Sequence, residues 1–219
     1  MQRIVFTLFL LASSASADIL LDQPLVFING RTSQVTSNNT GYITWDRIQL
    51  SQNSYVNQIS WVGGFFALGA STAPTPQADY WLFQVASDNN GVPGAVTDSV
   101  KVPFSSASRQ LIASGALGGM PANFYRLDIS LPATLFVAGR GIPQWFTIQA
   151  LGDGPSTFSW ISGSGGDGVA KQLDLSSGSY TSFRDRSLQL SGIAAVPEPR
   201  CELLLLSVLF AGRRFRIRA

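Results

Sequence analysis

The chain of 219 residues is 45% hydrophobic and only 13% charged, a balance that excludes an intrinsically disordered protein and allows one domain with a sizeable core. Its formal net charge of +2 comes from the two ends, because residues 18–196 carry nine Lys and Arg against eleven Asp. This slightly acidic stretch speaks against nucleic acid as a partner. The sequence has no histidine, and glutamate is missing from residues 18–196, which removes His-activated nucleophiles, His metal ligands and Glu acid/base pairs.

The amino end has the layout of a secretory signal peptide. A basic start at Arg3 is followed by an apolar run from Ile4 to Ala12, and Ala15 and Ala17 supply small residues at the −3 and −1 positions. We therefore expect residues 1–17 to be a signal peptide that is cleaved before Asp18. An uncleaved anchor and a first core strand are the two alternatives. The single cysteine, Cys201, lies near the other end, so the exported body holds no disulfide.

Residues 18–193 show a β pattern throughout. Apolar and polar residues alternate most clearly over Tyr125–Leu131, and no stretch shows a helical stripe. Glycine, asparagine and aspartate fill the spacers, as turns require. The least certain stretch is Ser105–Pro121, whose glycines also fit a long loop. The expected strands are Leu25–Ile28, Tyr42–Trp45, Gln58–Phe66, Trp81–Val85, Val100–Val102, Arg109–Ser114, Tyr125–Leu131, Phe146–Ala150, Thr157–Ile161 and Leu188–Leu190.

Short strands at this spacing predict an all-β fold, an antiparallel two-sheet sandwich that is jelly-roll-like. The predicted organisation is a signal peptide, one β-sandwich domain over residues 18–193, and a tail over residues 194–219 that contains a short hydrophobic helix.

The tail has three parts in a fixed order. Val196, Pro197, Glu198 and Pro199 come first, and the two prolines favour an extended, exposed segment. An apolar run, Leu203–Gly212, follows. As a helix its ten residues reach about 15 Å, whereas a membrane's hydrocarbon core is roughly 30 Å thick. The chain closes on four arginines, a typical cytoplasmic flank of a membrane segment: Arg213, Arg214, Arg216 and Arg218.

This order resembles the PEP-CTERM sorting signal. The resemblance implies a bacterial host and a processing partner, an exosortase-type membrane protease. It also implies that Val196–Pro199 is the recognition motif, that Leu203–Gly212 enters the membrane at least transiently, and that the arginines form a basic stop. The destination would be the cell envelope, the outer surface or the extracellular matrix. The alternative is an amphipathic C-terminal helix that rests on the domain.

The body adds a looser likeness between Gln58 and Trp160. Ile59–Phe65, the aromatic Tyr80–Val85 and the turn-rich Asp88–Gly94 follow one another as in the extracellular β-sandwich domains that often precede PEP-CTERM tails. This resemblance implies a fold and no activity. We therefore expect an exported protein that is not an enzyme, with no catalytic residue to assign.

The alternative function is a carbohydrate-binding module that acts on extracellular polysaccharide, because sugar rings stack on exposed aromatic faces. Alternation places Trp61 and Trp81 in the core. Tyr80 and Trp145 fall out of phase with their buried neighbours, and Trp160 lies beside a glycine-rich loop, so these three are the candidates for glycan stacking. Equally, an all-β core accounts for the tryptophans without any ligand.

Calcium is the candidate cofactor that we consider, since oxygen ligands suffice for it. Asp88 and Asn90 share one predicted turn, and Asp153 and Asp167 lie in two others. These four are the metal candidates. The alternative, which we prefer, is that they are turn residues that bond to their own backbone.

Overall fold

The computed structural model describes residues 17–195, which form β-strands and one turn of 3-10 helix. The all-β prediction is therefore confirmed for this part of the chain. The elements are β1 Asp18–Gln23, β2 Leu25–Thr32, β3 Gln34–Val35, β4 Gly41–Ile48, β5 Ser54–Phe66, β6 Tyr80–Asn89, β7 Val92–Pro103, η1 Phe104–Ser106, β8 Ser108–Leu117, β9 Met120–Val137, β10 Gln144–Leu151, β11 Thr157–Gly163, β12 Ala170–Asp174, β13 Ser179–Phe183 and β14 Leu188–Ala194.

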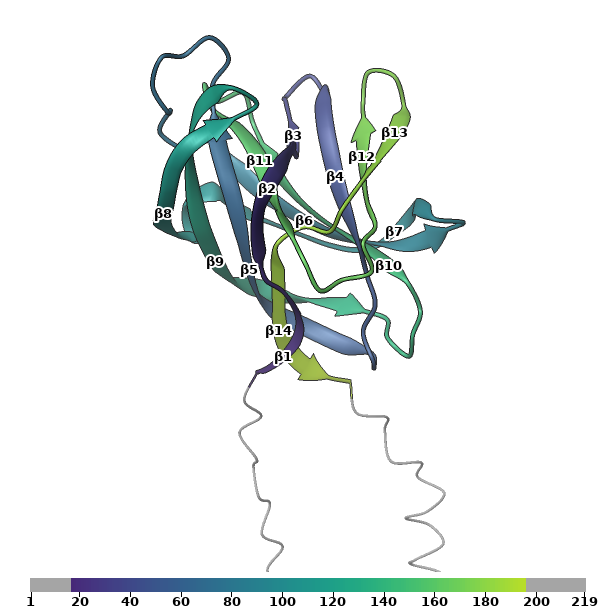
Figure 1. Ribbon diagram of the computed structural model, residues 1–219. Helices are drawn as coiled ribbons and strands as arrows, with labels where there is room; N and C mark the ends of the chain where they lie inside the picture. The colour runs from purple at the N-terminus through teal and green to yellow at the C-terminus, as the bar shows by residue number, and fades with distance from the viewer. Residues whose placement is uncertain (1–16, 196–219) are drawn as a thin grey trace, which may run out of the picture.

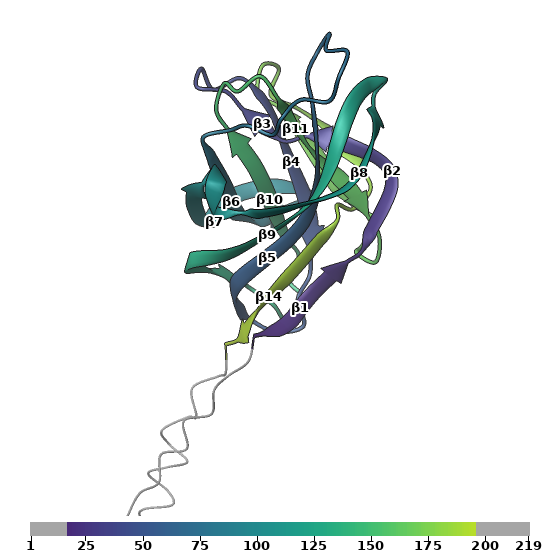
Figure 2. The same cartoon turned by 90° about the vertical axis from the view of Figure 1, so that its left-hand side faces the viewer.

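The strands form two sheets of seven strands each, which face one another as two layers (Figure 1 and Figure 2). Sheet I is built around the long strand β5. It pairs with β9 along one side and with β14 and β11 in succession along the other, and β8, β1 and β2 lie at the margins. Sheet II has the order β13-β12-β4-β3-β10-β6-β7. All pairings are antiparallel except the short parallel contact of β3 with β10.

Alternation along the strands places one apolar row from each sheet in the shared core. Trp61 of β5 and Trp81 of β6 meet edge to face with ring centroids 5.1 Å apart, as their parity predicts. Phe104 of η1 stacks on Trp81 at 4.9 Å, and Phe158 of β11 meets the same indole at 5.0 Å. Rings in such offset and edge-on contacts contribute stability beyond their buried area.

Each of the ten expected strands lies within an observed strand. The loop considered for Ser105–Pro121 is wrong. β8 and β9 form a hairpin, and its turn is Gly118-Gly119 with φ of 59° and 81°. A two-residue turn of this kind needs positive φ at both positions, which two glycines supply without strain. Four strands escaped prediction: β1, β3, β12 and β13.

The two described ends of the chain lie side by side. β14 runs between β1 and β5, so Asp18 is paired with Gly192, and the N–H of Ala195 donates to the carbonyl of Asn53. Ala17, the first described residue, is exposed, and β1 and β14 lie together at the bottom of the ribbon in Figure 1. The predicted signal peptide up to Ser16, with Ala15, and the sorting motif, the hydrophobic helix and the terminal arginines lie outside the described residues. Between residues 17 and 195 no helix is long and apolar enough to cross a membrane.

Candidate functional site

A hollow of about 420 Å³ opens on the outer face of sheet II. Alternate residues of β6 and β10 form the floor of the hollow. Tyr80, Leu82 and Gln149 point outward, whereas their neighbours Trp81 and Ile148 point into the core. The β3–β4 turn and β7 form its walls. The lining residues are Val35, Thr36, Ser37, Asn39, Ile43, Asp79, Tyr80, Leu82, Lys101, Gln149, Leu151 and Gly152.

Tyr80 is the aromatic group of this hollow. The prediction that it is exposed is confirmed, since 41% of its surface remains accessible. The ammonium nitrogen of Lys101 lies 4.0 Å from the ring centroid, a cation-π contact that holds the ring against β7. The carbonyl of Asp79 accepts from the Phe104 N–H at 3.0 Å, and the Asp79 N–H donates to Leu151 at 2.8 Å. The backbone beside Tyr80 is thereby fixed to η1 on one side and to β10 on the other.

The β3–β4 turn at the rim is fastened by Asp153, one of the predicted metal candidates. One carboxylate oxygen of Asp153 accepts a hydrogen bond from the Ser37 N–H at 3.0 Å. Hydrogen bonds from the side chain and backbone of Ser37 hold the pKa of Asp153 below its usual range. This exposed carboxylate is therefore ionised at neutral pH and is engaged with the turn.

Trp145 and Trp160, the other two candidates for glycan stacking, are wrong as exposed sites, because both are fully buried. Trp145 does lie on the outer face of sheet II, as its parity predicts. There it packs with Trp45 and Ala86, and its indole N–H donates to Asp88 at 2.7 Å. Trp160 belongs to the main core, and its indole N–H donates to the Ser187 carbonyl at 2.8 Å.

The predicted calcium ligands act as turn residues. The two carboxylate oxygens of Asp88 accept from Trp145 and from the Gly91 N–H, and Asn90 forms the β6–β7 turn with a positive φ of 53°. Asp167 forms an ion pair with Arg47 at 2.6 Å and accepts from the Val169 N–H. Within residues 17–195, no group of three or more acidic, Cys or His side chains could hold a metal ion.

A buried polar cluster inside the sandwich was not predicted. Asp46 of β4, Asp185 and Arg186 are all withdrawn from solvent, and neither carboxylate oxygen of Asp46 has a well-aligned hydrogen-bond partner among residues 17–195. Burial raises the pKa of Asp46 well above its ordinary value, and the nearby carboxylates of Asp185 and Asp167 add to the effect. Burial lowers the pKa of Arg186 to about 10, so this guanidinium is charged at neutral pH.

The neighbours of this cluster tie it to the backbone. Arg186 donates to the carbonyls of Arg184 and Trp160, and Asp185 accepts from the Gly168 N–H at 2.8 Å. Burial also raises the pKa of Asp185. With Asp46 out of contact with solvent, the cluster organises the β11–β12 loop and offers no surface to a ligand.

Comparison of the chain with protein-family models, with curated proteins and with solved structures found no match in any of the three.

Proposed function

We propose that this protein is an exported, non-enzymatic β-sandwich of jelly-roll-like type, sorted to the bacterial cell surface or extracellular matrix through its PEP-CTERM-like tail. The observation that carries the proposal is the pairing of β1 with β14, which brings the residue after Ala17 next to Gly192. The first and last strands of the described chain thus end at one margin of sheet I, and the cleavage points that we propose would adjoin these two ends. A domain processed there keeps its outer faces free for the surroundings.

The test is the intact mass of the protein recovered from its own cells and medium. A mass that starts at Asp18 and ends near Val196 supports both processing steps. Replacing Pro197, Glu198 and Pro199 with alanine should leave the body folded and retain the tail. A matched variant with Pro74 and Pro76 replaced should be processed like wild type. Removal of the tail from the first variant at the normal rate would contradict the recognition role.

A second function, carbohydrate binding, is favoured by the hollow around Tyr80. An exposed ring lies among amide, hydroxyl and carboxylate groups from Asn39, Ser37 and Asp79, the combination that suits a sugar ring with its hydroxyls. Binding fits better than hydrolysis. A glycosidase uses a pair of carboxyl groups, and Asp79 is the one carboxylate among the described residues that line the hollow.

The binding test is an NMR or calorimetric titration of the protein with soluble oligosaccharides of glucose, mannose, galactose and N-acetylglucosamine. Tyr80→Ala should abolish the binding seen with wild type, and Tyr80→Phe should keep most of it. Tyr55→Ala is the matched control, because Tyr55 is 40% exposed on sheet I. Equal binding by Tyr80→Ala and wild type would exclude this site.

A further inference from the structure

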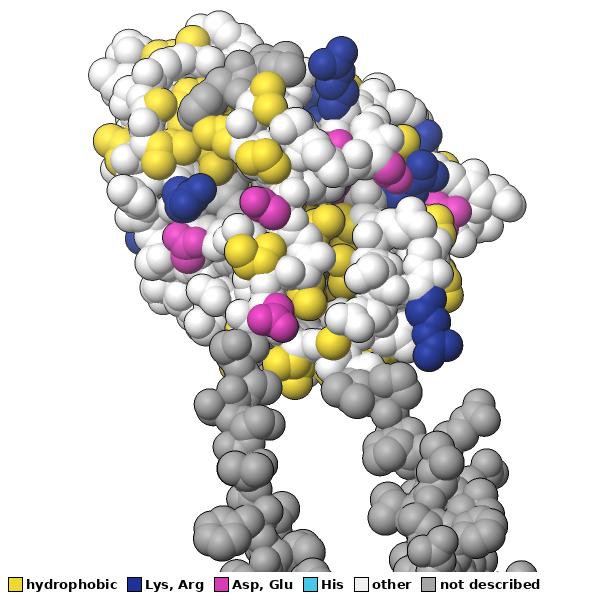
Figure 3. Space-filling view, turned by 60° about the horizontal axis from the view of Figure 1, so that its bottom comes forward, with side chains coloured by type: hydrophobic (Ala, Val, Ile, Leu, Met, Phe, Trp, Pro, Cys, Tyr) yellow, Lys and Arg dark blue, Asp and Glu magenta, His cyan; other side chains and the backbone are white. Residues whose placement is uncertain are grey.

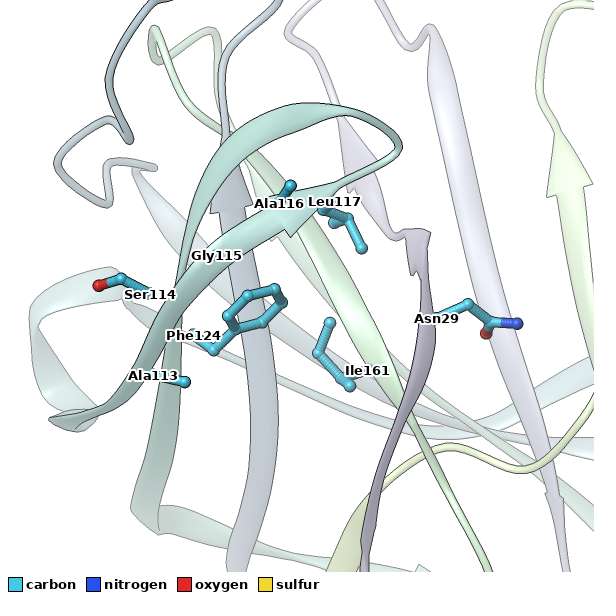
Figure 4. A pocket seen from close by; sticks show the side chains of 8 residues that line it. All are labelled: Asn29, Ala113, Ser114, Gly115, Ala116, Leu117, Phe124 and Ile161. Carbon is cyan, nitrogen blue, oxygen red and sulfur yellow. The ribbon is translucent and has the colours of Figure 1, made fainter.

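Two of the concave surfaces of the described chain differ in charge. The groove of about 280 Å³ on sheet I is lined by small and apolar side chains such as Phe124 and Ile161, and none of its lining residues is charged (Figure 4). The hollow of about 420 Å³ at Tyr80 contains one cation, Lys101, and one carboxylate, Asp79. A ligand in the hollow therefore meets two fixed charges, whereas a ligand in the groove would meet none.

The ammonium group of Lys101 has hydrogen-bond donors that the described protein leaves unused. Its nitrogen lies 4.0 Å from the centroid of the Tyr80 ring, and among residues 17–195 no hydrogen bond or ion pair engages it. An ammonium carries three N–H donors, and a contact with a ring face leaves donors free on the other side. These donors are available to an acceptor on a molecule that occupies the hollow.

The strand register places Lys101 and Gln149 on opposite sides of Leu82. Leu82 of β6 pairs with Lys101 of β7 and with Gln149 of β10, so the three residues form a row across the outer face of sheet II. The Gln149 side chain is 2% exposed and is held in place because its Nε2 donates to Gln84 at 2.9 Å. With strands about 4.8 Å apart, the Cα atoms of Lys101 and Gln149 are about 10 Å apart. One sugar ring on Leu82 would thus lie between these two polar groups.

The carboxylate of Asp79 lies toward another end of the hollow. A Cβ atom built on Gly152 would be 2.7 Å from a carboxylate oxygen of Asp79, so this carboxylate lies against the backbone that follows β10. Asp79 is three residues from Leu82, the partner of Lys101, which puts the Cα atoms of Asp79 and Lys101 about 11 Å apart. The hollow is therefore basic toward β7 and acidic toward the end of β10.

We propose that the hollow binds a uronic acid unit of an acidic polysaccharide, with the sugar carboxylate on Lys101 and sugar hydroxyls donating to Gln149 and Asp79. This inference rests on the carbohydrate-binding function proposed above and narrows it to one class of sugar. A hydrogen bond between an ammonium and a carboxylate is stronger than one to a neutral hydroxyl, which favours the acid over a neutral sugar. Lys and Arg are scattered over the face in Figure 3 and form no continuous basic patch there, so the preference depends on this one contact.

The first test is a calorimetric titration of the full-length protein, held in a mild detergent, with tetramers of galacturonic, glucuronic and mannuronic acid. Each tetramer is compared with its methyl ester, which has the same chain without the charges. Wild type should bind one acid about tenfold more tightly than its ester at low salt, and added salt should reduce the difference. Equal affinity for every acid and its ester would overturn the acid preference and leave sugar binding intact. No binding of any acidic or neutral sugar would overturn both proposals.

The second test assigns the preference to Lys101. Lys101→Met keeps a long side chain without the charge and should lower the affinity for the acidic tetramer about tenfold, with less than a twofold change for the ester. Lys101→Arg should keep the preference. Lys171→Met is the matched control on β12, outside the hollow, and should bind like wild type. Equal melting temperatures check that the variants are folded. A folded Lys101→Met protein that still prefers the acid would refute the assignment.

Discussion

The interior between the two sheets has an apolar region around Trp81 and a polar, ionisable region around Asp46. Around Trp81, four aromatic rings close the space between the sheets, with centroids 4.9–6.5 Å from the indole. Around Asp46, the same two sheets enclose two carboxylates and the guanidinium of Arg186. The aromatic region contributes its stability at any pH, because nothing in it titrates. The polar region costs free energy whenever Asp46 is charged, and its contribution therefore depends on pH.

The largest effect is expected from Trp81→Ala. Deleting this buried indole leaves a cavity among the surrounding rings and should lower the free energy of unfolding by about 3–5 kcal/mol. Urea unfolding should give the same loss of unfolding free energy at pH 5 and at pH 8, because no titratable group takes part in these ring contacts. Trp81→Phe serves as the control and should lose clearly less. A loss that changed with pH would break the contrast between the regions.

Arg186→Met comes next. It removes the cation beside Asp46 and three donors to backbone carbonyls, and should cost about 2–4 kcal/mol at neutral pH. Adding Asp46→Asn should restore part of the loss, because the uncompensated carboxylate is then gone. A double-mutant cycle by urea unfolding measures this coupling. Strict additivity of the two substitutions would show that their charges do not interact.

Asp46→Asn alone should stabilise the protein at neutral pH. The pKa of Asp46 is higher in the folded than in the unfolded chain. The contribution of Asp46 to the free energy of unfolding is therefore full below about pH 3.9, the pKa in the unfolded chain, and is lost as the pH rises through the pKa in the folded chain. Each pKa unit of difference amounts to about 1.4 kcal/mol. Urea unfolding across pH 3–8 should show the variant gaining on wild type as the pH rises. If the free energies of unfolding of variant and wild type differed by the same amount at every pH, the raised pKa of Asp46 would be contradicted.

The smallest effect, with the opposite sign, is expected at the surface. Hydrogen bonds from Ser176 lower the pKa of the exposed Asp174, so its contribution is present above the unfolded pKa and is lost as the pH falls through the folded one. Asp174→Ala should lower the melting temperature slightly at pH 7 and not at pH 2. A larger effect than that of Asp46→Asn would reverse the ranking of buried and exposed carboxylates.

Alternation in the sequence was sufficient for much of the fold because most strands have one dry face. It identified β9 by Tyr125–Leu131 and correctly turned Trp81 inward and Tyr80 outward. It missed β12 and β13, whose hairpin is polar and lies at an edge, and β3, which has two residues. β3 and β12 are completed by backbone partners that are distant in sequence, β10 and β4, and β13 pairs with β12 alone, so no local apolar pattern records these strands.

The candidate site shows the same limit. Parity placed Trp145 on the outer face of sheet II, which is correct, but parity does not reveal that Trp45 covers that part of the face. Asp46 lies between Thr44 and Ile48 among the residues of β4 that point into the sandwich. Because this set mixes polar and apolar residues, the sequence pattern does not predict that the carboxylate is buried. The hollow itself joins β3, β6, β7 and β10, which only the assembled sheet brings together.

The place of β14 between β1 and β5 has a consequence for the timing of folding. A chain that leaves a translocation pore with its amino end first cannot complete sheet I until β14 has emerged. The reason is that β1 pairs with β14, so that Asp18 has no partner until Gly192 is free. Contacts between such distant parts of a chain form slowly. If the chain is exported as we propose, sheet I therefore stays incomplete until β14 has followed the other described strands through the pore.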